Sequence, residues 1–491
     1  MHLRSDLHIG GRWRAGGEGT RFPVTDPADG STIAEFAAAT EQDCLDAVDA
    51  ADAAADTWAA TSPRTRSELL RATFQLLQEE RETMAEIIVR ENGKALSDAL
   101  GEADYAIEFF RWFAEEAVRI GGDFRLSPNG DKHIIVTRQP IGVSLLITPW
   151  NFPAAMATRK IAPALAAGCT MVLKPALETP LTAAYVVDAL QRAGLPDGVV
   201  NLVTPLRTGP LVAAMVHHPA VRKLSFTGST EVGRLLLREA ADTVVSSSME
   251  LGGNAPFIVL PGADLDAAVS GAMIAKMRNG GSACTAANRF YVHSSLYVEF
   301  ADRLTEAMRA VRTGPGLEPD VQLGALVSLQ ERDKVAALVA DAVADGAGIT
   351  TGGHVTGTGA FYEPTVVVDV RHGSLLTSTE IFGPVAPLIA YDDVTDAVRM
   401  ANDTIYGLIS YVYGEPGPAL EVAQRLEAGM VAVNRAVLSD PAAPFGGVKQ
   451  SGLGREGSSE GILEFLEEKY IGMDVPRATH RPEGRPTPVP Q

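Results

Sequence analysis

Short apolar runs alternate with amphipathic stretches along most of this chain, and that alternation constrains its fold more than any other feature. The first block of this kind begins at residue 143. Its apolar runs lie at 143–147, 171–173, 199–203, 223–226 and 244–248, and the helical stretches between them lie near 154–167, 180–193, 208–217 and 230–241. Strands that are apolar throughout and are joined by helices of this size predict a parallel, doubly wound sheet.

A second alternating block runs from about 256 to 435. It contains an expected strand at 289–293, a helical stretch after Ser295, a strand after Pro384 and a last strand at 430–433. A chain of 491 residues has room for two to four domains. The sequence therefore predicts an α/β protein with two parallel-sheet domains.

Two helices are expected before the first block. Thr40 and Asp43 have the spacing of a capping box and open one of them. Ser62-Pro63 provides an N-cap and a first-turn proline for a second, long helix, which Asn92-Gly93 would end. Its apolar face consists of Leu69, Leu70, Phe74, Leu77, Met84 and Ile88.

Three segments fit neither block. Residues 122–126 and 132–138 flank the turn signal Asn129-Gly130 and predict a β-hairpin. Residues 464–471 favour a further edge strand, and exposed edge strands usually need to be paired or covered. The tail at 476–491 has five prolines and no apolar periodicity, so we expect it to be disordered.

Composition excludes several classes of partner. A formal net charge of −19 disfavours nucleic acid and anionic membranes, which need a basic surface. The three cysteines are too widely separated for a disulfide framework or a metal cluster. The N-terminus lacks the apolar stretch of a signal peptide, and no run approaches the roughly 20 apolar residues of a membrane span. We therefore expect a cytoplasmic protein without metal, nucleic-acid or membrane partners.

Three short segments carry candidate chemistry. Cys284 lies in the small-residue loop Arg278-Asn-Gly-Gly-Ser-Ala-Cys-Thr, Glu250 lies in Met-Glu-Leu-Gly-Gly-Asn, and Asn151 lies in Thr-Pro-Trp-Asn-Phe-Pro. An accessible thiol, a carboxylate and a side-chain amide are the groups needed for covalent chemistry on a carbonyl. The alternatives are a buried structural cysteine, a helix-capping carboxylate and a turn asparagine.

In their order and wording, these segments resemble the aldehyde dehydrogenase superfamily, and the resemblance extends from about Asp6 to Met473. It implies the aldehyde dehydrogenase-like fold, with two parallel-sheet α/β domains and a small β oligomerisation domain. Residues 1–119 and 142–251 would form the dinucleotide-binding domain, and 252–451 the catalytic domain. Residues 120–141 and 452–475 would form the oligomerisation segments of a homodimer or homotetramer.

The resemblance also assigns catalytic roles. Cys284 would attack an aldehyde, and the resulting oxyanion would be held by the Asn151 side chain and the Cys284 backbone N–H. Loss of hydride to a nicotinamide would leave a thioester, and Glu250 would activate the water that releases the acid. Relatives that transfer the acyl group to CoA typically lack this glutamate, so its presence favours hydrolysis. A non-catalytic structural protein on the same fold is the alternative of a different class.

Cofactor residues follow from the same resemblance. The segment from Phe226 to Gly233 follows an expected strand and opens a helix, but it lacks the G-x-G-x-x-G spacing. The further cofactor positions implied are Trp150, Lys174, Leu177, Gly228, Ser229, Leu251, Glu380 and Phe382. NAD-preferring relatives often carry glutamate where this chain has Leu177, and that carboxylate would repel a 2′-phosphate. We therefore expect NADP or NAD, with a preference for NADP; an ordinary surface lysine is the alternative for Lys174.

The substrate positions resemble those of succinate-semialdehyde dehydrogenases. Arg159, Arg278 and Ser439 stand where two arginines and a serine bind the distal carboxylate, and Phe445 belongs to the adjoining Pro-Phe-Gly-Gly motif. Guanidinium groups suit bidentate carboxylate binding. A small anionic aldehyde is therefore the expected substrate. Glutarate semialdehyde, a sulfonated aldehyde and, after these, a neutral or aromatic aldehyde remain alternatives, and either arginine could instead form a structural ion pair.

Overall fold

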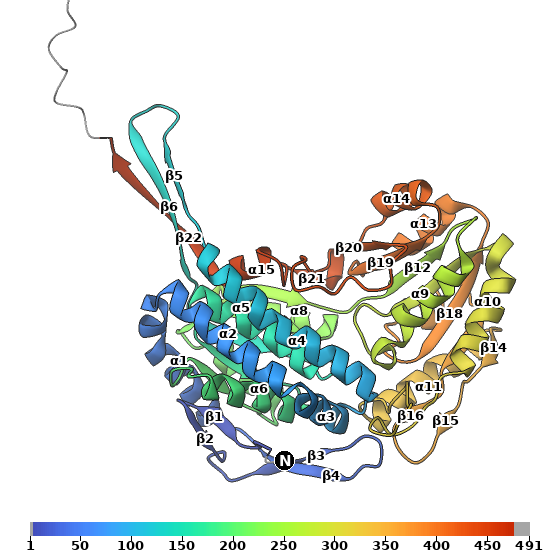
Figure 1. Cartoon of the computed structure of the whole chain (residues 1–491), viewed down its shortest axis with the longest axis horizontal. Coiled ribbons are helices and arrows are strands. Elements are labelled where there is room, and N and C mark those ends of the chain that lie inside the picture. Colours follow the sequence, from blue (N-terminus) through green and yellow to red (C-terminus); the bar gives the residue numbers. More distant parts are fainter. Residues whose placement is uncertain (1–2, 476–491) are drawn as a thin grey trace, which may run out of the picture.

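The computed structural model describes residues 3–475. The tail for which we predict disorder, residues 476–491, lies outside the described residues. Two α/β bodies lie side by side, and a narrow β-arm projects from the first body (Figure 1). Within the described part of the chain, no helix combines the length and the apolar character needed to cross a bilayer.

The first body is built on an eight-stranded sheet with the order β2-β1-β9-β8-β7-β10-β11-β21. Five adjacent strands are parallel: β9 (Val200–Leu202), β8 (Met171–Lys174), β7 (Val143–Ile147), β10 (Val221–Thr227) and β11 (Ser246–Glu250). Antiparallel strands complete both edges: β1 (Leu7–Ile9), β2 (Arg12–Arg14) and β21 (Gly452–Leu453). The predicted apolar runs correspond to the five parallel strands.

Helices cover this sheet as the alternating pattern predicts. The connecting helices are α5 (Pro153–Ala167), α6 (Pro180–Arg192), α7 (Thr208–Val216) and α8 (Thr230–Thr243), and α1 (Glu41–Ala60) also packs against the sheet. Thr40 and Asp43 form the expected capping box of α1. Every residue of α5 is buried, because the helix lies between the sheet and α4 (Leu96–Glu116).

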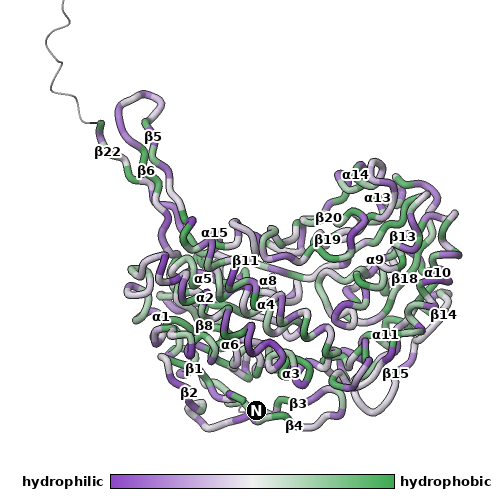
Figure 2. The backbone as a smooth tube through the Cα atoms, viewed as in Figure 1, coloured by the Kyte–Doolittle hydropathy of each residue, from purple (hydrophilic) through white to green (hydrophobic). Residues whose placement is uncertain are grey.

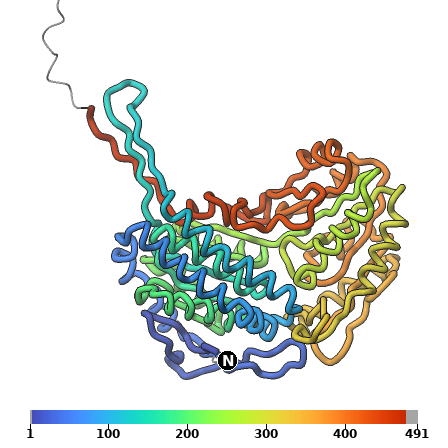
Figure 3. The backbone as a smooth tube through the Cα atoms, in the orientation of Figure 1, coloured from blue at the N-terminus to red at the C-terminus, as the bar shows by residue number. Residues whose placement is uncertain are grey.

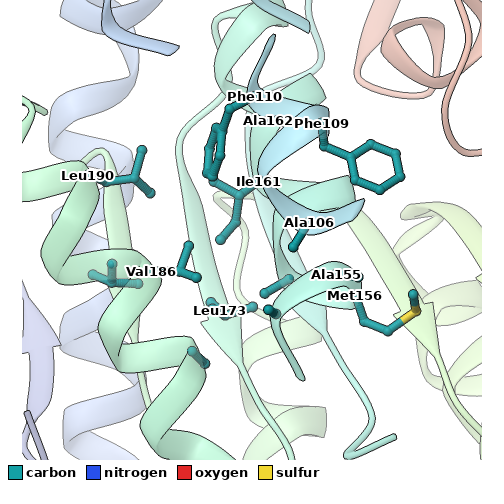
Figure 4. Close-up of a cluster of buried hydrophobic side chains, with 14 of the residues drawn as sticks. Ala106, Phe109, Phe110, Ala155, Met156, Ile161, Ala162, Leu173, Val186 and Leu190 are labelled. Atoms are coloured by element: carbon teal, nitrogen blue, oxygen red, sulfur yellow. The ribbon is translucent and has the colours of Figure 1, made fainter. Parts of the chain in front are cut away.

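Side chains from four elements form one core layer here. Figure 4 shows Phe109 and Phe110 of α4, Met156 and Ile161 of α5, Leu173 of β8, and Val186 and Leu190 of α6 within one buried cluster. Close packing on both sides fixes α5, which begins at Pro153, two residues after Asn151. The core therefore positions a segment that carries candidate chemistry.

The expected long helix after Ser62 is two helices, so that prediction was wrong in one detail. Helix α2 (Pro63–Glu79) and helix α3 (Arg81–Asn92) are separated at Glu80, which leaves the helical conformation at φ −102° and ψ 17°. The Glu80 carboxylate binds Arg192 and Tyr185 of α6, with contacts of 2.6 Å and 2.5 Å. Tertiary contacts thus override a continuous helical pattern.

The second body has a seven-stranded sheet with the order β14-β17-β18-β13-β12-β19-β20. All neighbours are parallel except β14 with β17. The strands are β12 (Ala255–Val259), β13 (Ala287–His293), β14 (Gly348–Thr351), β17 (Thr365–Val368), β18 (Val385–Tyr391), β19 (Ile409–Tyr413) and β20 (Met430–Val433). Its helices are α9 (Leu265–Met277), α10 (Ser294–Arg309), α11 (Leu329–Ala344), α12 (Leu375–Ser378), α13 (Val394–Asn402) and α14 (Pro416–Arg425).

The arm is a three-stranded antiparallel sheet with the order β22-β6-β5. Strands β5 (Asp123–Leu126) and β6 (Lys132–Pro140) form the predicted hairpin, and β22 (Leu466–Asp474) is the expected late strand. Apolar side chains on the arm face solvent: Phe124 is 64% exposed, Tyr470 56% and Met473 47%. Figure 2 shows hydrophobic positions along this projecting sheet.

Residues 251–254 lead from β11 of the first body to β12 of the second, and two further segments also connect the bodies. The N-terminal ribbon of β3 (Arg21–Thr25) and β4 (Thr32–Ala37) runs beneath the first body to the second, where Ala360 N donates to Pro27 O at 3.0 Å (Figure 3). The C-terminal segment after β20 returns across the first body to the arm. The remaining short elements are η1 (Ala117–Arg119), η2 (Arg278–Gly281), β15 (Val355–Thr356), β16 (Phe361–Tyr362), η3 (Lys449–Ser451) and α15 (Glu460–Leu463).

Candidate active site

A cavity of about 210 Å³ has walls from both bodies. It is lined by Tyr105, Pro149, Trp150, Asn151, Phe152, Met156, Arg159, Thr227, Gly228, Ser229, Leu251, Gly252, Arg278, Cys284, Thr285, Glu331, Lys334, Glu380, Phe382, Ser439 and Phe445. Of the residues predicted for catalysis, cofactor and substrate, those outside this lining are Glu250, Lys174 and Leu177. Residues far apart in the sequence thus meet around one cavity.

Cys284 lies on the cavity wall, half-buried, after a tight loop. Asn279, Gly280 and Gly281 all have positive φ values, of 55°, 58° and 77°. A Cβ on Gly281 would lie 2.1 Å from Gly383 O, so the loop needs glycine there for two reasons. Burial raises the pKa of the Cys284 thiol to about 12, although the Arg159 and Arg278 cations oppose the rise. The thiol is therefore protonated at neutral pH and needs a base.

Asn151 faces the loop that carries the cysteine. Its Nδ2 donates to Ser282 O at 3.2 Å, and its Oδ1 accepts from Phe152 N at 3.1 Å. These two contacts assign the orientation of the amide, with the nitrogen toward the cysteine loop. Because an amide nitrogen carries two N–H groups, one remains for an oxyanion.

Glu250 ends β11 and is buried, with neither carboxylate oxygen hydrogen-bonded within the described residues. A Cβ on Gly446 would lie 2.9 Å from Glu250 Oε1, so glycine leaves the carboxylate its space. Burial raises the pKa of Glu250 well above its usual 4.5, and the nearby Glu456 carboxylate raises it further. A carboxylate with a raised pKa is a stronger base at neutral pH.

Glu456 is the neighbour that sequence reasoning missed. It is buried beside Glu250 and forms ion pairs with Arg159 and Lys160, each at 2.5 Å. Burial alone would raise its pKa, but these two cations outweigh that effect and lower it. Glu456 therefore stays charged. The sequence did contain a sign of this residue. Glu456 lies between Gly454 and Gly457, and Glu250 likewise has glycines close by, at 252 and 253.

The expected diphosphate loop lies at the cavity where β10 leads into α8. Ser229 is the N-cap of α8 and accepts from Val232 N, and Gly228 lines the cavity beside it. The Thr227 hydroxyl is buried there without a hydrogen-bond partner among the described residues. A helix N-terminus with an unsatisfied hydroxyl fits the diphosphate of a dinucleotide.

The other cofactor positions flank this loop. Lys174 is buried at the end of β8, and burial lowers the pKa of its ammonium although Glu178 opposes the shift. Leu177 is half-buried and Glu178 is exposed. Leu251, directly after Glu250, lines the cavity.

A second group of cofactor positions comes largely from the second body. Glu380 Oε1 accepts from Gly253 N at 3.1 Å, and burial raises the pKa of Glu380 to about 7. The Phe382 ring meets Trp150 edge-to-face at 5.5 Å. Sequence reasoning missed Glu331 and Lys334 of α11, an ion pair at 2.5 Å that also lines the cavity. Generic charges on a helix give no signal of such a position.

The predicted substrate residues lie together. Arg278 Nη1 donates to Ser439 Oγ at 3.1 Å, and both residues line the cavity with Cys284. The Arg159 guanidinium carbon lies 4.1 Å from the Phe445 ring centroid. Arg159 also forms the structural ion pair kept as an alternative, with Glu456, yet its Nη2 is buried without a hydrogen-bond partner in the described chain. The two arginines therefore bring positive charge to a cavity that holds the thiol.

A doubly wound body, a second α/β body and a cysteine, carboxylate and amide brought together between them define a recognisable class. The aldehyde dehydrogenase family profile matches residues 13–471, and the chain belongs to the aldehyde dehydrogenase family. The superfamily and fold predicted from the sequence are thereby confirmed.

Individual relatives cover nearly the whole chain. A succinate-semialdehyde dehydrogenase of Paenarthrobacter nicotinovorans is 50% identical over 446 residues, which cover 90% of this chain and 99% of the relative. A glutarate-semialdehyde dehydrogenase of Pseudomonas aeruginosa is 46% identical, covering 96% and 97%. Among solved structures, an E. coli NADP-dependent enzyme matches with a TM-score of 0.95 and 44% identity, covering 96% of this chain and 98% of that one.

Proposed function

We propose that this protein oxidises succinate semialdehyde to succinate with NADP⁺, and that it hydrolyses its own thioester intermediate. The observation that carries the substrate is the Arg278–Ser439 contact of 3.1 Å in the same cavity as Cys284, with Arg159 beside it. These donors suit a carboxylate at the far end of a short aldehyde. The 50% identical succinate-semialdehyde dehydrogenase supports the choice.

In the first step, Cys284 loses its thiol proton to solvent water, and the thiolate attacks the aldehyde carbon. The free N–H of Asn151 Nδ2 and the Cys284 backbone N–H stabilise the oxyanion that forms. When NADP⁺ is bound, it accepts the hydride that leaves the Cys284 adduct. Glu250 then removes a proton from the water that hydrolyses the thioester.

For the cofactor, we propose that Lys174, Gly228, Ser229 and Glu380 hold NADP⁺, with Trp150, Leu251 and Phe382 packed around it. Leu177 supplies no carboxylate to repel a 2′-phosphate, and the buried Lys174 ammonium offers it a cation. Residues 1–119 and 142–251 would then form the cofactor-binding domain, and 252–451 the catalytic domain. The 44% identical E. coli NADP-dependent enzyme supports this cofactor.

We also propose that the segments 120–141 and 452–475 bind a second copy of the chain through the arm (β5, β6 and β22) to give a homodimer or homotetramer. The second segment begins with β21, which belongs to the sheet of the first body. Support comes from the exposed side chains of Phe124, Tyr470 and Met473. The edge strands β5 and β22 also support it, because among the described strands each pairs only with β6 and leaves its outer edge unpaired. Unpaired edges with apolar side chains favour association.

The substrate proposal is tested with Arg278→Ala and Ser439→Ala. Each charge-assisted hydrogen bond contributes roughly 1.5–3 kcal/mol, so kcat/KM for succinate semialdehyde should fall about 10- to 150-fold in Arg278→Ala and less in Ser439→Ala. Butanal, which has the same carbon chain without the carboxylate, should be affected less than about three-fold. Arg159→Ala is a poorer probe, because it also removes a cation from Glu456.

Glutarate semialdehyde is the second candidate, since a relative with that activity is 46% identical. Both aldehydes should be assayed with NADP⁺ and NAD⁺. A higher kcat/KM for glutarate semialdehyde would identify that aldehyde as the substrate and keep the carboxylate site. If Arg278→Ala and Ser439→Ala lowered kcat/KM for butanal as much as for succinate semialdehyde, the carboxylate site itself would be refuted. Leu177→Glu should lower the preference for NADP⁺ by repelling the 2′-phosphate; an unchanged preference would contradict the role of Leu177.

A further inference from the structure

Three side chains at and just after the end of α3 hold backbone groups of other segments, two of which line the active-site cavity. Asn92 Nδ2 donates to Trp150 O at 2.9 Å, and Lys94 Nζ donates to Asn151 O at 2.8 Å. Glu91 accepts from Leu181 N and Thr182 N, both at 2.8 Å. All three side chains are buried. The sequence pattern shows this segment only as the end of a helix.

The Lys94 ammonium has a buried anionic partner. Its Nζ lies 2.5 Å from Glu102 Oε2, and both side chains are almost fully inaccessible to solvent. The other oxygen, Glu102 Oε1, accepts from Ala154 N at 2.8 Å and from Ala155 N at 3.3 Å. Burying two charges is costly, and a pair of this kind persists only when its remaining donors and acceptors are satisfied. Here they are satisfied by the backbone around Asn151.

Glu102 also takes the place of a missing helix cap. Helix α5 begins with Pro153 and has no side-chain N-cap hydrogen bond. The amides of Ala154 and Ala155 would otherwise lack acceptors, because the first four N–H groups of a helix have no intrahelical partner. A carboxylate at this end is further stabilised by the helix dipole. Glu102 therefore fixes the start of the helix, which begins two residues after Asn151.

The Asn151 carbonyl is held from a second side as well. Asn279 Nδ2 donates to Asn151 O at 2.9 Å and to Ser282 O at 2.8 Å, which connects the asparagine to the cysteine loop. With Lys94 and Asn279 on its carbonyl, the backbone of Asn151 is clamped while its side-chain amide points to the Cys284 loop. Oxyanion donors act through such preorganisation, since small displacements weaken transition-state binding.

We propose that the buried Lys94–Glu102 pair is a positioning element for catalysis, which holds Asn151 in register with Cys284 without touching the substrate. Neither side chain is among the described residues that line the cavity. The inference rests on the proposed role of Asn151 as the oxyanion donor. It predicts that loss of the pair slows the chemical step through Asn151 and leaves ground-state binding largely intact.

The test is a double-mutant cycle on the full-length protein with Lys94→Met, Glu102→Gln and Asn151→Ala. Lys94→Met and Glu102→Gln should each lower kcat at least about 10-fold, with KM for succinate semialdehyde and NADP⁺ within about three-fold. In the Asn151→Ala background the same changes should lower kcat less than about two-fold further, because residues that act through one group are not additive. Kinetics are normalised to the fraction of protein that binds NADP⁺.

Glu91→Gln is the matched control, since it makes the same substitution in another buried carboxylate that caps a helix. Glu91 accepts from the second and third residues of α6, as Glu102 does for α5, but it contacts neither Trp150 nor Asn151 among its hydrogen bonds. Its kcat should stay within about three-fold of wild type. An equal loss in Glu91→Gln and Glu102→Gln would point to general loosening of the core and overturn the proposal.

The possible outcomes distinguish the proposed oxyanion role of Asn151 from the proposed positioning role of Lys94 and Glu102. If Asn151→Ala retains wild-type kcat, the proposed oxyanion role fails. If Asn151→Ala is impaired but Lys94→Met multiplies the loss in that background, the positioning role fails and the proposed function stands. Should Lys94→Met fail to fold, Glu102→Gln, which keeps an acceptor for Ala154 N, carries the cycle alone.

Discussion

Burial raises the pKa of both Glu250 and Cys284, and this has a consequence for the pH dependence of the reaction. The pKa of Glu250 lies well above 4.5 and that of Cys284 is raised to about 12. Each must be deprotonated to act as base or nucleophile, so the active fraction grows as pH rises. We expect kcat/KM to increase steadily from pH 6 to pH 9 in initial-rate assays. A profile that is flat or falls over this range would contradict the assignment of these groups.

Glu250→Gln separates the two halves of the reaction. If Glu250 activates the hydrolytic water, the variant should still form about one equivalent of NADPH per active site, while steady-state turnover falls about 100-fold or more. Hydroxylamine serves as a control, because it attacks a thioester without a base and should restore turnover. Loss of the initial NADPH as well would show that the first step also needs Glu250, and would contradict a role limited to hydrolysis.

Helices α3 and α6 are joined by Glu91, whose ionisation affects stability. Burial raises the pKa of Glu91 to about 8, against 4.5 for an exposed glutamate. Between these two pH values the folded state binds a proton that the unfolded state has lost. The stability that Glu91 contributes is therefore present below pH 4.5 and declines as pH rises to about 8, by up to ~1.4 kcal/mol per pH unit.

The comparison of wild type with Glu91→Gln measures this decline. Glutamine has no ionisation, so the urea midpoint of the wild type should fall relative to that of the variant between pH 5 and pH 8. Parallel midpoints over this range would show that Glu91 ionises normally in the folded protein.

At the same scale, sequence patterns predicted elements well where packing follows a simple rule. Parallel strands buried on both faces appear as uninterrupted apolar runs, so β7 and β20 begin and end where the sequence indicated. The break at Glu80 escaped prediction because Arg192 and Tyr185, more than a hundred positions away, capture its carboxylate. Lys94 and Glu102 escaped for a related reason: a lysine after a helix and a glutamate within one resemble solvent-exposed residues until their buried partners are known.

For the whole molecule, the site residues were recognised through family motifs, while their meeting depends on the fold. Asn151 follows β7 and Cys284 precedes β13, so segments next to strands of two separate sheets meet at one cavity. Glu250 ends β11 directly before Leu251, which lines that cavity. The spacing of these residues in the sequence does not predict that they meet. Cytoplasmic location stays a prediction.

The projecting arm gives a prediction about assembly. Phe124→Asp combined with Tyr470→Asp places charges on the exposed apolar surface of β5 and β22. If this surface binds a second copy, sedimentation should detect a smaller species than for the wild type. Val244→Asp, at a side chain that is 88% exposed on α8's C-terminus, is the control and should leave assembly unchanged. A double variant that sediments like wild type would assign the contact to another surface.

The returning C-terminal segment also determines when the protein becomes reactive during its synthesis. Ser439, Phe445 and Glu456 all follow β20, the last strand of the second sheet, and β21 completes the edge beside Glu250. During synthesis, Cys284 therefore leaves the ribosome well before Ser439 and Phe445, which complete the cavity wall. Domains generally fold as they emerge, yet catalysis must wait until residues 439–456 have emerged. We therefore expect a chain that is released before Ser439 has been added to contain Cys284 but to lack dehydrogenase activity.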